Sequence, residues 1–260
     1  MIVKTLLIAS LSLSPLLGIS AHEIAQKVHD RDDGDNAVSN MQMTLIDKNG
    51  KKRVRNLKTF TKDRGIDRLR LMFFLSPADV KDTGFLTYDY DDSTKDDDQW
   101  LYLPELKKVK RIASSDKSSS FMGSDFSYSD MTLRNVDDYS YKIMKEPLVG
   151  GEKTWQMMVI PKSDKVIAET GYTKSIIFVR QDNFIVIQAL HYVKLGKKLK
   201  YMKVTGLEKI EDIWTITKMQ MTTKKAKKSL HKTIFEFSDT QYNQALEEAF
   251  FSTRTLERGL

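Results

Sequence analysis

Clustered carboxylates are the side chains of this sequence that look best suited to chemistry. Eight Asp and two Lys lie between Asp79 and Asp98, and the densest stretch is residues 89–98, D-Y-D-D-S-T-K-D-D-D. Carboxylates gathered in this way can bind Ca²⁺, but the Gly and the final Glu of an EF-hand loop are missing. A solvated turn at a hairpin tip is the simpler interpretation, so we predict no metal site.

The other groups that commonly carry catalysis are few. The four histidines, His22, His29, His191 and His231, form no metal-ligand spacing, and the chain has no cysteine. There is no G-x-S-x-G nucleophile motif and no phosphate-binding loop. No general acid stands out beside the clustered carboxylates, which disfavours hydrolysis by paired acids. We therefore expect a protein without a cofactor that is not an enzyme, and we expect His191 to be a core or wall residue.

Positive charge is concentrated in the C-terminal part of the chain, whose formal net charge is +7 overall. Twelve Lys lie between Lys194 and Lys232, against only three acidic residues, and residues 224–228 read K-K-A-K-K. Such a patch can contact phosphates or steer an anionic partner. The simplest interpretation is a solvated hairpin tip. If the patch does bind, an anionic membrane surface is a better partner than nucleic acid for an exported protein.

Export is predicted by the first residues. Lys4 precedes an apolar run from Thr5 to Leu17, and small residues then lead to a cleavage site after Ala21, just before His22. A membrane anchor is the alternative, but this run is shorter than the ~20 residues that span a bilayer. We expect a signal peptide at 1–21 and one soluble periplasmic domain at 22–260. A chain without cysteine has neither disulfides nor a lipoprotein anchor.

Alternating patterns predict mostly β-structure. Residues 22–31 read as a short helix, and 238–256 as a C-terminal helix that docks on the sheet. The short links between strands favour an antiparallel meander. The expected strands are 40–47, 52–61, 67–75, 83–90, 99–103, 139–145, 154–161, 173–180, 184–195, 199–210, 213–222 and 230–237.

Several of these strands are apolar on both faces, whereas a half-exposed strand alternates apolar and polar residues. In 67–75, Leu71 and Phe73 share one face while Met72 and Phe74 occupy the other. Helices can cover one face, and the other is expected to close around a hydrophobic cavity, although a filled core would give the same pattern. A slip of one residue in register would exchange the two faces. The expected lipid-binding wall consists of Leu71, Phe73, Leu75, Leu86, Tyr88, Trp100, Tyr102, Met157 and Val159.

A long segment without strand character interrupts the sheet at 113–130. It is rich in Ser, Gly and Asp but carries four large apolar side chains that need an apolar surface. We expect a few helical turns and a mobile lid or docking loop at Ser118–Met131, with a permanently docked loop as the alternative. Its expected functional residues are Phe121, Met122, Gly123 as a hinge, Phe126 and Tyr128.

The chain resembles the LolA-like family of outer-membrane lipoprotein-sorting proteins. The resemblance covers most of the mature chain and is most specific over 74–131. A common form of the first motif has Gly where this chain has Asp82. The strings that carry the resemblance are F-L-S-P-A-D-V at 74–80, G-F-L-T-Y-D-Y at 84–90, D-D-D-Q-W-L-Y-L-P at 96–104, K-K-V-K-R-I at 107–112 and S-F-M-G-S-D-F-S-Y at 120–128.

This resemblance implies an incomplete antiparallel β-barrel with helices that line or plug its concave side. It also implies a periplasmic carrier that binds the acyl chains of lipoproteins or other lipids, often together with an RND-type (MMPL) exporter of the inner membrane. Envelope-stress sensors share this barrel, so a binding module that transports nothing, either a sensor or an exporter adaptor, is the alternative function.

Overall fold

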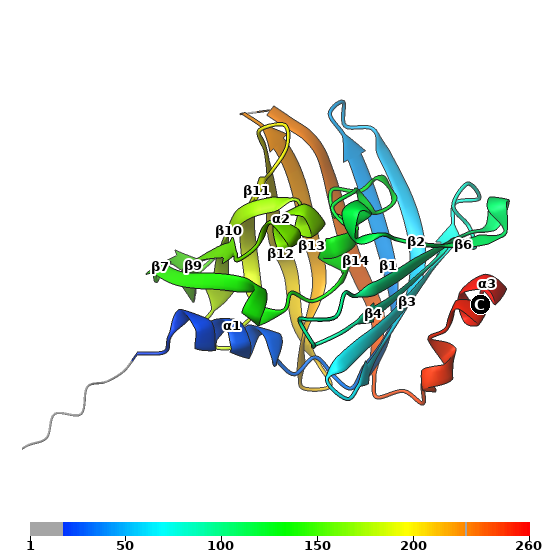
Figure 1. The fold of residues 1–260 in the computed structure, drawn as a ribbon, viewed down its shortest axis with the longest axis horizontal. Helices are drawn as coiled ribbons and strands as arrows, with labels where there is room; N and C mark the ends of the chain where they lie inside the picture. Colours follow the sequence, from blue (N-terminus) through cyan, green and yellow to red (C-terminus); the bar gives the residue numbers. More distant parts are fainter. Residues whose placement is uncertain (1–17, 227) are drawn as a thin grey trace, which may run out of the picture.

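The computed structural model describes residues 18–226 and 228–260, and most of them belong to one large antiparallel sheet (Figure 1). The sheet has 14 strands and follows the order β6-β5-β4-β3-β2-β1-β14-β13-β12-β11-β10-β9-β7, with β8 paired to β9. Its two ends do not meet, so the sheet is a half-barrel, as predicted. The strands are β1 Asn36–Asp47, β2 Lys52–Arg64, β3 Asp67–Ser76, β4 Gly84–Asp89, β5 Asp98–Leu103, β6 Lys108–Arg111, β7 Tyr139–Lys145, β8 Leu148–Val149, β9 Glu152–Pro161, β10 Tyr172–Arg180, β11 Val186–Val193, β12 Lys198–Ile210, β13 Ile213–Lys225 and β14 Lys228–Tyr242.

Three short α-helices accompany the sheet: α1 Ala21–His29, α2 Asp164–Thr170 and α3 Thr253–Arg258. Ser20 caps α1, because its hydroxyl accepts from the Glu23 amide while the Glu23 carboxylate accepts from the Ser20 amide. In the part of the chain that the structure describes, none of the helices has the length and apolar character needed to cross a bilayer. Most of the expected signal peptide lies outside the described residues, so the signal peptide and the domain limits stay predictions.

The C-terminal helix predicted at 238–256 is wrong in extent. Strand β14 continues to Tyr242, which pairs with Ala37 of β1, and a short turn of 3-10 helix precedes α3. The sequence pattern of this region suits a helix, but hydrogen bonding along the full length of β1 extends the strand. Helix α2 and strand β6 were not predicted from the sequence.

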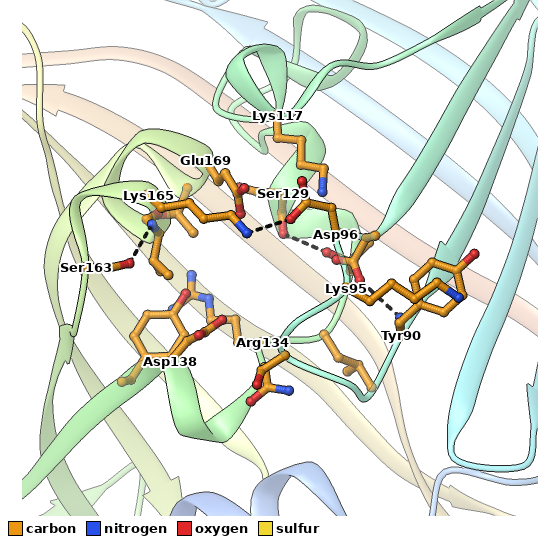
Figure 2. A pocket seen from close by; sticks show the side chains of 18 of the residues that line it. Tyr90, Lys95, Asp96, Lys117, Ser129, Arg134, Asp138, Ser163, Lys165 and Glu169 are labelled. Carbon is orange, nitrogen blue, oxygen red and sulfur yellow. Dashed lines mark hydrogen bonds and ion pairs between the residues drawn. The ribbon is translucent and has the colours of Figure 1, made fainter.

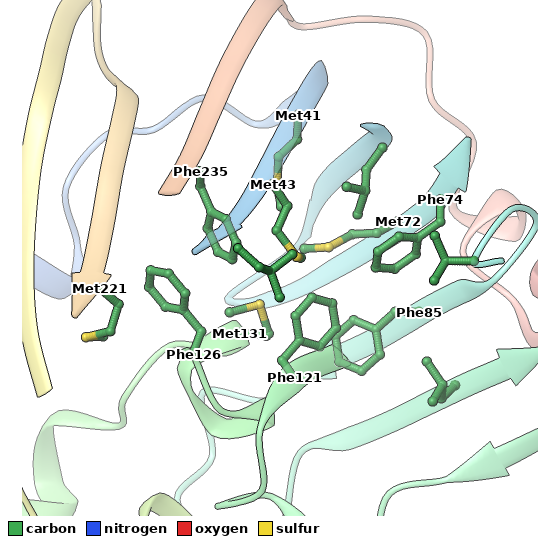
Figure 3. Close-up of a cluster of buried hydrophobic side chains, with 14 of the residues drawn as sticks. Met41, Met43, Met72, Phe74, Phe85, Phe121, Phe126, Met131, Met221 and Phe235 are labelled. Carbon is green, nitrogen blue, oxygen red and sulfur yellow. The ribbon is translucent and has the colours of Figure 1, made fainter. Parts of the chain in front are cut away.

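The segment 113–138, called the plug here, lies inside the concave side of the half-barrel (Figure 1). It consists of short 3-10 turns, as the sequence predicted, at Ser114–Asp116, Phe121–Gly123, Tyr128–Met131 and Val136–Asp138. Its apolar side chains pack against the concave face of β1–β5 and of β13–β14, in the cluster of Figure 3. The buried members of this cluster are Met41, Met43, Leu45, Leu57, Met72, Phe74, Val80, Phe85, Leu101, Ile112, Phe121, Phe126, Met131, Met221 and Phe235.

The C-terminal segment covers the opposite, convex face of β3–β5. Phe251 and Leu256 are fully buried there, against Leu71, Phe73 and Leu86. The approach is close at Gly84, where an added Cβ would lie 2.6 Å from Leu256 Cδ1, so only glycine fits. The sequence signature of two apolar faces thus has a physical cause: the plug covers one face of β3 and the C-terminal segment covers the other.

The turn after β3 explains the departure from the common motif. Asp82 has φ = 63°, in the left-handed region that glycine adopts most easily and Asp tolerates better than most residues. Its amide donates to the carbonyl of Phe74, 2.8 Å away. Asp82 therefore makes the tight connection to β4 in a backbone conformation that glycine also adopts.

Phe121 provides a test of the plug as part of the core. Its ring is fully buried and lies 5.0 Å from the ring of Phe85 and 5.6 Å from that of Tyr128, measured between centroids. We expect Phe121→Ala to lower the free energy of unfolding by about 3–5 kcal/mol in denaturant titrations. The control Leu106→Ala, at a side chain that is 61% exposed, should change it by less than about 0.5 kcal/mol. Equal effects of the two changes would contradict a core role for the plug.

Candidate functional site

An apolar cavity of about 300 Å³ lies between the concave face of β9–β13, the plug and α1. Three methionines on its sheet wall give it a flexible, polarizable surface that adapts to ligands of different shape. The sheet contributes Val159, Ile177, Val186, Ala189, His191, Met202, Met219 and Met221. Tyr141 of β7 also belongs to the sheet wall, and the opposite wall is formed by Ala25, Val28, His29, Phe126, Asp130, Thr132, Leu133, Arg134 and Val136.

Most of the predicted wall residues lie elsewhere. Val159 lines the cavity, and Met157 is buried on the same face of β9, in a cluster with Ile24 of α1. Leu75 is 42% exposed near the end of β3. The other six pack on the convex face against the C-terminal segment, so their predicted placement is wrong: Leu71, Phe73, Leu86, Tyr88, Trp100 and Tyr102.

The prediction assigned the inward-facing positions of β3–β5 one residue away from where the structure places them. Leu71 pairs with Leu86, and the adjacent pair Met72 and Phe85 points to the concave side. Both faces of these strands are apolar, so alternation alone cannot say which face turns inward. The sequence analysis did not predict that the methionines of β12 and β13 line the cavity. Met219 and Met221 are two residues apart and therefore lie on one face of β13, which is a pattern that could have indicated their role.

The predicted lid residues lie in the plug, beside the cavity. Phe121 and Phe126 are buried, Met122 and Tyr128 are partly buried, and all four belong to the cluster of Figure 3 or pack against it. Gly123 has φ = 75° and follows Met122 at φ = 49°, so two left-handed residues in succession form a tight turn at the proposed hinge. Whether this segment moves stays a prediction.

Polar contacts tie the plug to the concave face of the sheet. Asp125 is a buried carboxylate whose Oδ2 accepts from Thr233 Oγ1 at 2.8 Å and lies 2.7 Å from His231 Nδ1. From the sheet, Arg55 Nη1 donates to the carbonyl of Met122 and Arg70 Nη1 to that of Met131. A carboxylate buried in this way needs such partners, because leaving it unpaired would be costly. The plug is therefore held in one position by specific bonds as well as by its apolar side chains.

A buried polar cluster forms one end of the cavity. Tyr172 donates to Asp130 Oδ2 at 2.7 Å, and Lys200 Nζ donates to the Tyr172 hydroxyl at 3.2 Å. Burial raises the pKa of Asp130, but the charges of Lys200 and Arg134 and the hydrogen bond from the Ser127 amide outweigh it, so the pKa ends below its ordinary value. Asp130 is thus an anion at neutral pH.

His191 belongs to the same end of the cavity and stacks on Tyr172, with 4.6 Å between ring centroids. Its Nδ1 lies 2.7 Å from Ser175 Oγ, a pairing that resembles a nucleophile and its base. Burial, followed by the charge of Arg134, lowers the pKa of His191 to about 3. An imidazole of such weak basicity is a poor acceptor for the Ser175 proton. The pair therefore reads as a structural hydrogen bond.

A second, polar hollow of about 170 Å³ lies on the other side of residues 132–134 (Figure 2). Its walls carry carboxylates and lysines from the predicted acidic cluster, the plug and α2. Asp96 accepts from Lys165 Nζ at 2.7 Å and from Ser114 Oγ at 3.0 Å. Within 18–226 and 228–260 no three acidic or histidine side chains are grouped as metal ligands. Asp96 of the acidic cluster takes part in a hydrogen bond and an ion pair with neighbouring elements.

Asp89 connects β4 to the plug and responds to pH. Its Oδ2 accepts from the Leu133 amide at 2.6 Å. Burial, together with the charge of Asp97, raises the pKa of Asp89 from 3.8 to about 7. A carboxyl with a raised pKa favours the fold while it is protonated, so its contribution to stability falls as pH rises from near 3.8 to about 7.

We expect Asp89→Asn to remove this loss, because the amide keeps an acceptor for Leu133 and carries no charge. The stability that the variant gains relative to the parent should grow between about pH 4 and about pH 8, to an amount on the order of 4 kcal/mol. The measurement is the free energy of unfolding in denaturant at several pH values.

Asp79→Asn, at an exposed carboxyl, is the control and should show no such gain. His191 has the opposite effect, since its lowered pKa makes the fold less stable as pH falls towards 3. It is present in parent and variant alike, so its effect cancels in the difference. A difference between Asp89→Asn and parent that stays constant over this pH range would contradict the assignment.

Comparison with known proteins places the fold among related structures. The sequence matches a family model described as "Uncharacterized protein" over residues 66–258. A DUF1329 family protein from Desulfovibrio piger is 32% identical over 91% of this chain and 97% of its own, with a TM-score of 0.82. A putative outer membrane lipoprotein-sorting protein domain from Vibrio parahaemolyticus is 29% identical over 92% of this chain and 98% of its own, with a TM-score of 0.83.

A more distant structure has the same fold. A LolA superfamily protein from Nitrosomonas europaea is 18% identical over 92% of this chain and 100% of its own, with a TM-score of 0.68. None of the curated proteins matches the sequence. The half-barrel with a plugged concave side is thus a LolA-type architecture.

Proposed function

The chain belongs to the DUF1329 family and has the LolA-like fold, and from this premise we propose that it is a periplasmic lipid carrier. It binds acyl chains of lipoproteins or other lipids in the cavity and moves them between the inner and outer membranes. The name of the Vibrio parahaemolyticus relative, a putative lipoprotein-sorting domain, supports this class of cargo.

The apolar cavity is the observation that carries the proposal. Its sheet wall is apolar apart from His191 and the hydroxyl of Tyr141. Burial of an acyl chain there contributes roughly 0.8 kcal/mol per CH₂. Several methylenes suffice to offset the cost of association. A binding role without catalysis also agrees with the weakly basic His191.

An anionic membrane surface is supported as a docking partner by lysines at one edge of the sheet. The tips of the β1–β2, β11–β12 and β13–β14 hairpins lie together there (Figure 1). Leu195, on the β11–β12 tip, is 75% exposed and available to the membrane interface. In the described part of the chain, none of the lysines of these tips forms an ion pair: Lys48, Lys51, Lys52, Lys194, Lys197, Lys198, Lys224, Lys225 and Lys228.

The proposed docking face for a protein partner lies on the convex side, and the resemblance suggests that this partner is an RND-type (MMPL) exporter. Met158, Ile176, Leu190 and Tyr201 pair across β9–β12 and form a partly exposed apolar row. The C-terminal segment covers the matching face only on the other half of the sheet. Exposed apolar rows of this kind are typical of interaction sites.

A binding module without transport, such as a sensor or an exporter adaptor, is the second candidate. The observation that favours it is the anchoring of the plug by Asp125, Arg55 and Arg70, which would hold the cavity in one state. A carrier has to load and release its cargo, so the two candidates differ in whether the plug moves.

A larger side chain that fills the cavity tests the proposal that the protein is a lipid carrier. We expect lipid in organic extracts of protein purified from its own periplasm, and we expect Met202→Trp to lose most of it because the indole occupies the space of the chain. Overpacking should cost about 1–3 kcal/mol, which the variant can tolerate. Mass spectrometry of the extracts is the measurement.

Lys203→Trp is the matched control, since its exposed side chain lies on the other face of the same strand, outside the apolar row of the proposed docking face. It should retain the lipid content of the parent protein. A parent protein that carries no lipid, or a Met202→Trp variant that carries as much as the control, would overturn the proposal.

Hydrogen exchange tests the lid. We expect amides of Ser118–Met131 to exchange at different rates with and without bound lipid, because a ligand that enters beside Phe126 changes what the plug packs against. The amides of β1 and β14 at the centre of the sheet serve as the internal control. Equal, strong protection of the segment in both states would mean a static plug and would favour the second candidate.

A further inference from the structure

Arg134 occupies a unique place on the cavity walls. Among the described residues that line the apolar cavity it is the one Lys or Arg, and Asp130 is the one acid. Thr132, Leu133 and Arg134 also line the polar hollow, so this short stretch of the plug belongs to the walls of both spaces. A molecule with an apolar chain in the cavity and its polar end at this stretch would contact Arg134.

The guanidinium of Arg134 is positioned by aromatic rings and not by hydrogen bonds. It lies 6.0 Å from the ring centroid of Tyr139 and 5.5 Å from that of Tyr172. Its nearest carboxylate contact is Asp130 Oδ1 at 3.7 Å, beyond a good hydrogen bond. Within the ranges that the structure describes, no side-chain or backbone acceptor bonds to it by the usual geometric criteria. Its donors are thus available to a ligand.

Asp130 is committed to other groups. Its Oδ2 accepts from the Tyr172 hydroxyl at 2.7 Å and from the Ser127 amide at 2.9 Å. Lys200 reaches the same network through Tyr172. Tyr172 and His191 are neutral, because burial raises the pKa of Tyr172 and lowers that of His191. Asp130 is thus shared between Arg134 and Lys200, and Asp125 also acts on Lys200, whose pKa burial lowers. The hydrogen bonds of Asp130 go to Tyr172 and Ser127, so Asp130 does not occupy the donors of Arg134.

We propose that Arg134 binds the anionic headgroup of a single-chain amphiphile, a carboxylate or a phosphate, while the acyl chain lies in the apolar cavity. This inference rests on the proposed function and adds the chemical class of the ligand. A guanidinium matches the oxygens of both anions with paired donors. The volume of about 300 Å³ lies at the lower end of ligand cavities and favours one chain over two.

The polar hollow limits where the anion can sit. Its walls include the carboxylates of Asp97, Asp138 and Glu169, which disfavour an anion beyond Arg134. One oxygen of Glu169 is buried without a hydrogen-bond partner, so the hollow can accept a donor, such as the ammonium of a phosphoethanolamine. The anion stops at Arg134, and any further part of the headgroup extends into the hollow.

Titration of three lipids that share one chain length tests the site. The delipidated mature protein is titrated with hexadecanoate, palmitoyl lysophosphatidylethanolamine and neutral hexadecanol, at a pH where the fatty acid is ionised. We expect at least one of the two anion-bearing lipids to bind about tenfold or more tighter than hexadecanol. The tighter of the two identifies the headgroup as carboxylate or phosphate.

Variants of Arg134 test whether this side chain causes the preference for an anionic headgroup. Arg134→Gln should reduce affinity for the preferred anion to that for hexadecanol and leave hexadecanol binding unchanged. Arg134→Lys keeps the charge and should keep part of the preference, which covers the case of an unstable glutamine variant. Arg111→Gln, at an exposed arginine paired with Asp98, is the control and should bind as the parent does.

The outcomes separate this inference from the proposed function. Equal affinity of the parent for all three lipids, or a proportional loss of all three in Arg134→Gln, overturns the headgroup site and leaves the carrier intact. Binding of none of them to the parent overturns the carrier and the headgroup site together.

Discussion

A β-sheet that is apolar on both faces must be covered on both faces, and the rest of this structure follows from that constraint. On β3–β5 the two covers come from distant parts of the chain, the plug on the concave side and the C-terminal segment on the convex side. Either cover alone would leave Phe74 and Phe85, or Leu71 and Leu86, in water. Removing such side chains from water is the main favourable term in folding.

The other half of the sheet is covered less completely, and this difference creates the site. The plug fills the concavity over β1–β5 and β14 but leaves space over β9–β13, where α1 closes only part of the opening. Methionines at this position line a space that they do not fill. A small, incompletely packed region beside a tightly packed one is the physical basis of a binding site in an otherwise rigid barrel.

Buried carboxylates determine how the plug is held. Asp125 joins it to β14, Asp89 joins it to β4, and Asp130 joins it to Tyr172 at the start of β10. Each carboxylate accepts at least one hydrogen bond from across the boundary between the plug and the sheet, because a buried charge without partners is costly. These bonds orient the 132–134 stretch between the apolar cavity and the polar hollow. The position of Arg134 is thus a consequence of the same contacts that fix the plug.

The sequence alone determined much of this protein. The apolar run at 67–75 and β-type patterns such as that of 199–210 predicted the strands, and the short turns between them predicted antiparallel neighbours. The serine-rich stretch with its large apolar residues was identifiable as a separate segment, and its motifs indicated the half-barrel. These features depend on interactions between residues that are close in the sequence, so the local sequence is enough to predict them.

Only the tertiary structure decided which face of each strand turns inward. Leu71 and Met72 are equally apolar, and what distinguishes them is whether Phe251 or Phe121 lies across from each. The end of β14 was likewise decided by pairing with β1 and not by its own pattern. The cavity depends on where the plug stops and α1 begins, and Arg134 gains its role from rings on β7 and β10. Contacts between residues far apart in the chain leave no local sequence pattern. They form only when the sheet curves and the plug, α1 and the C-terminal segment pack against it.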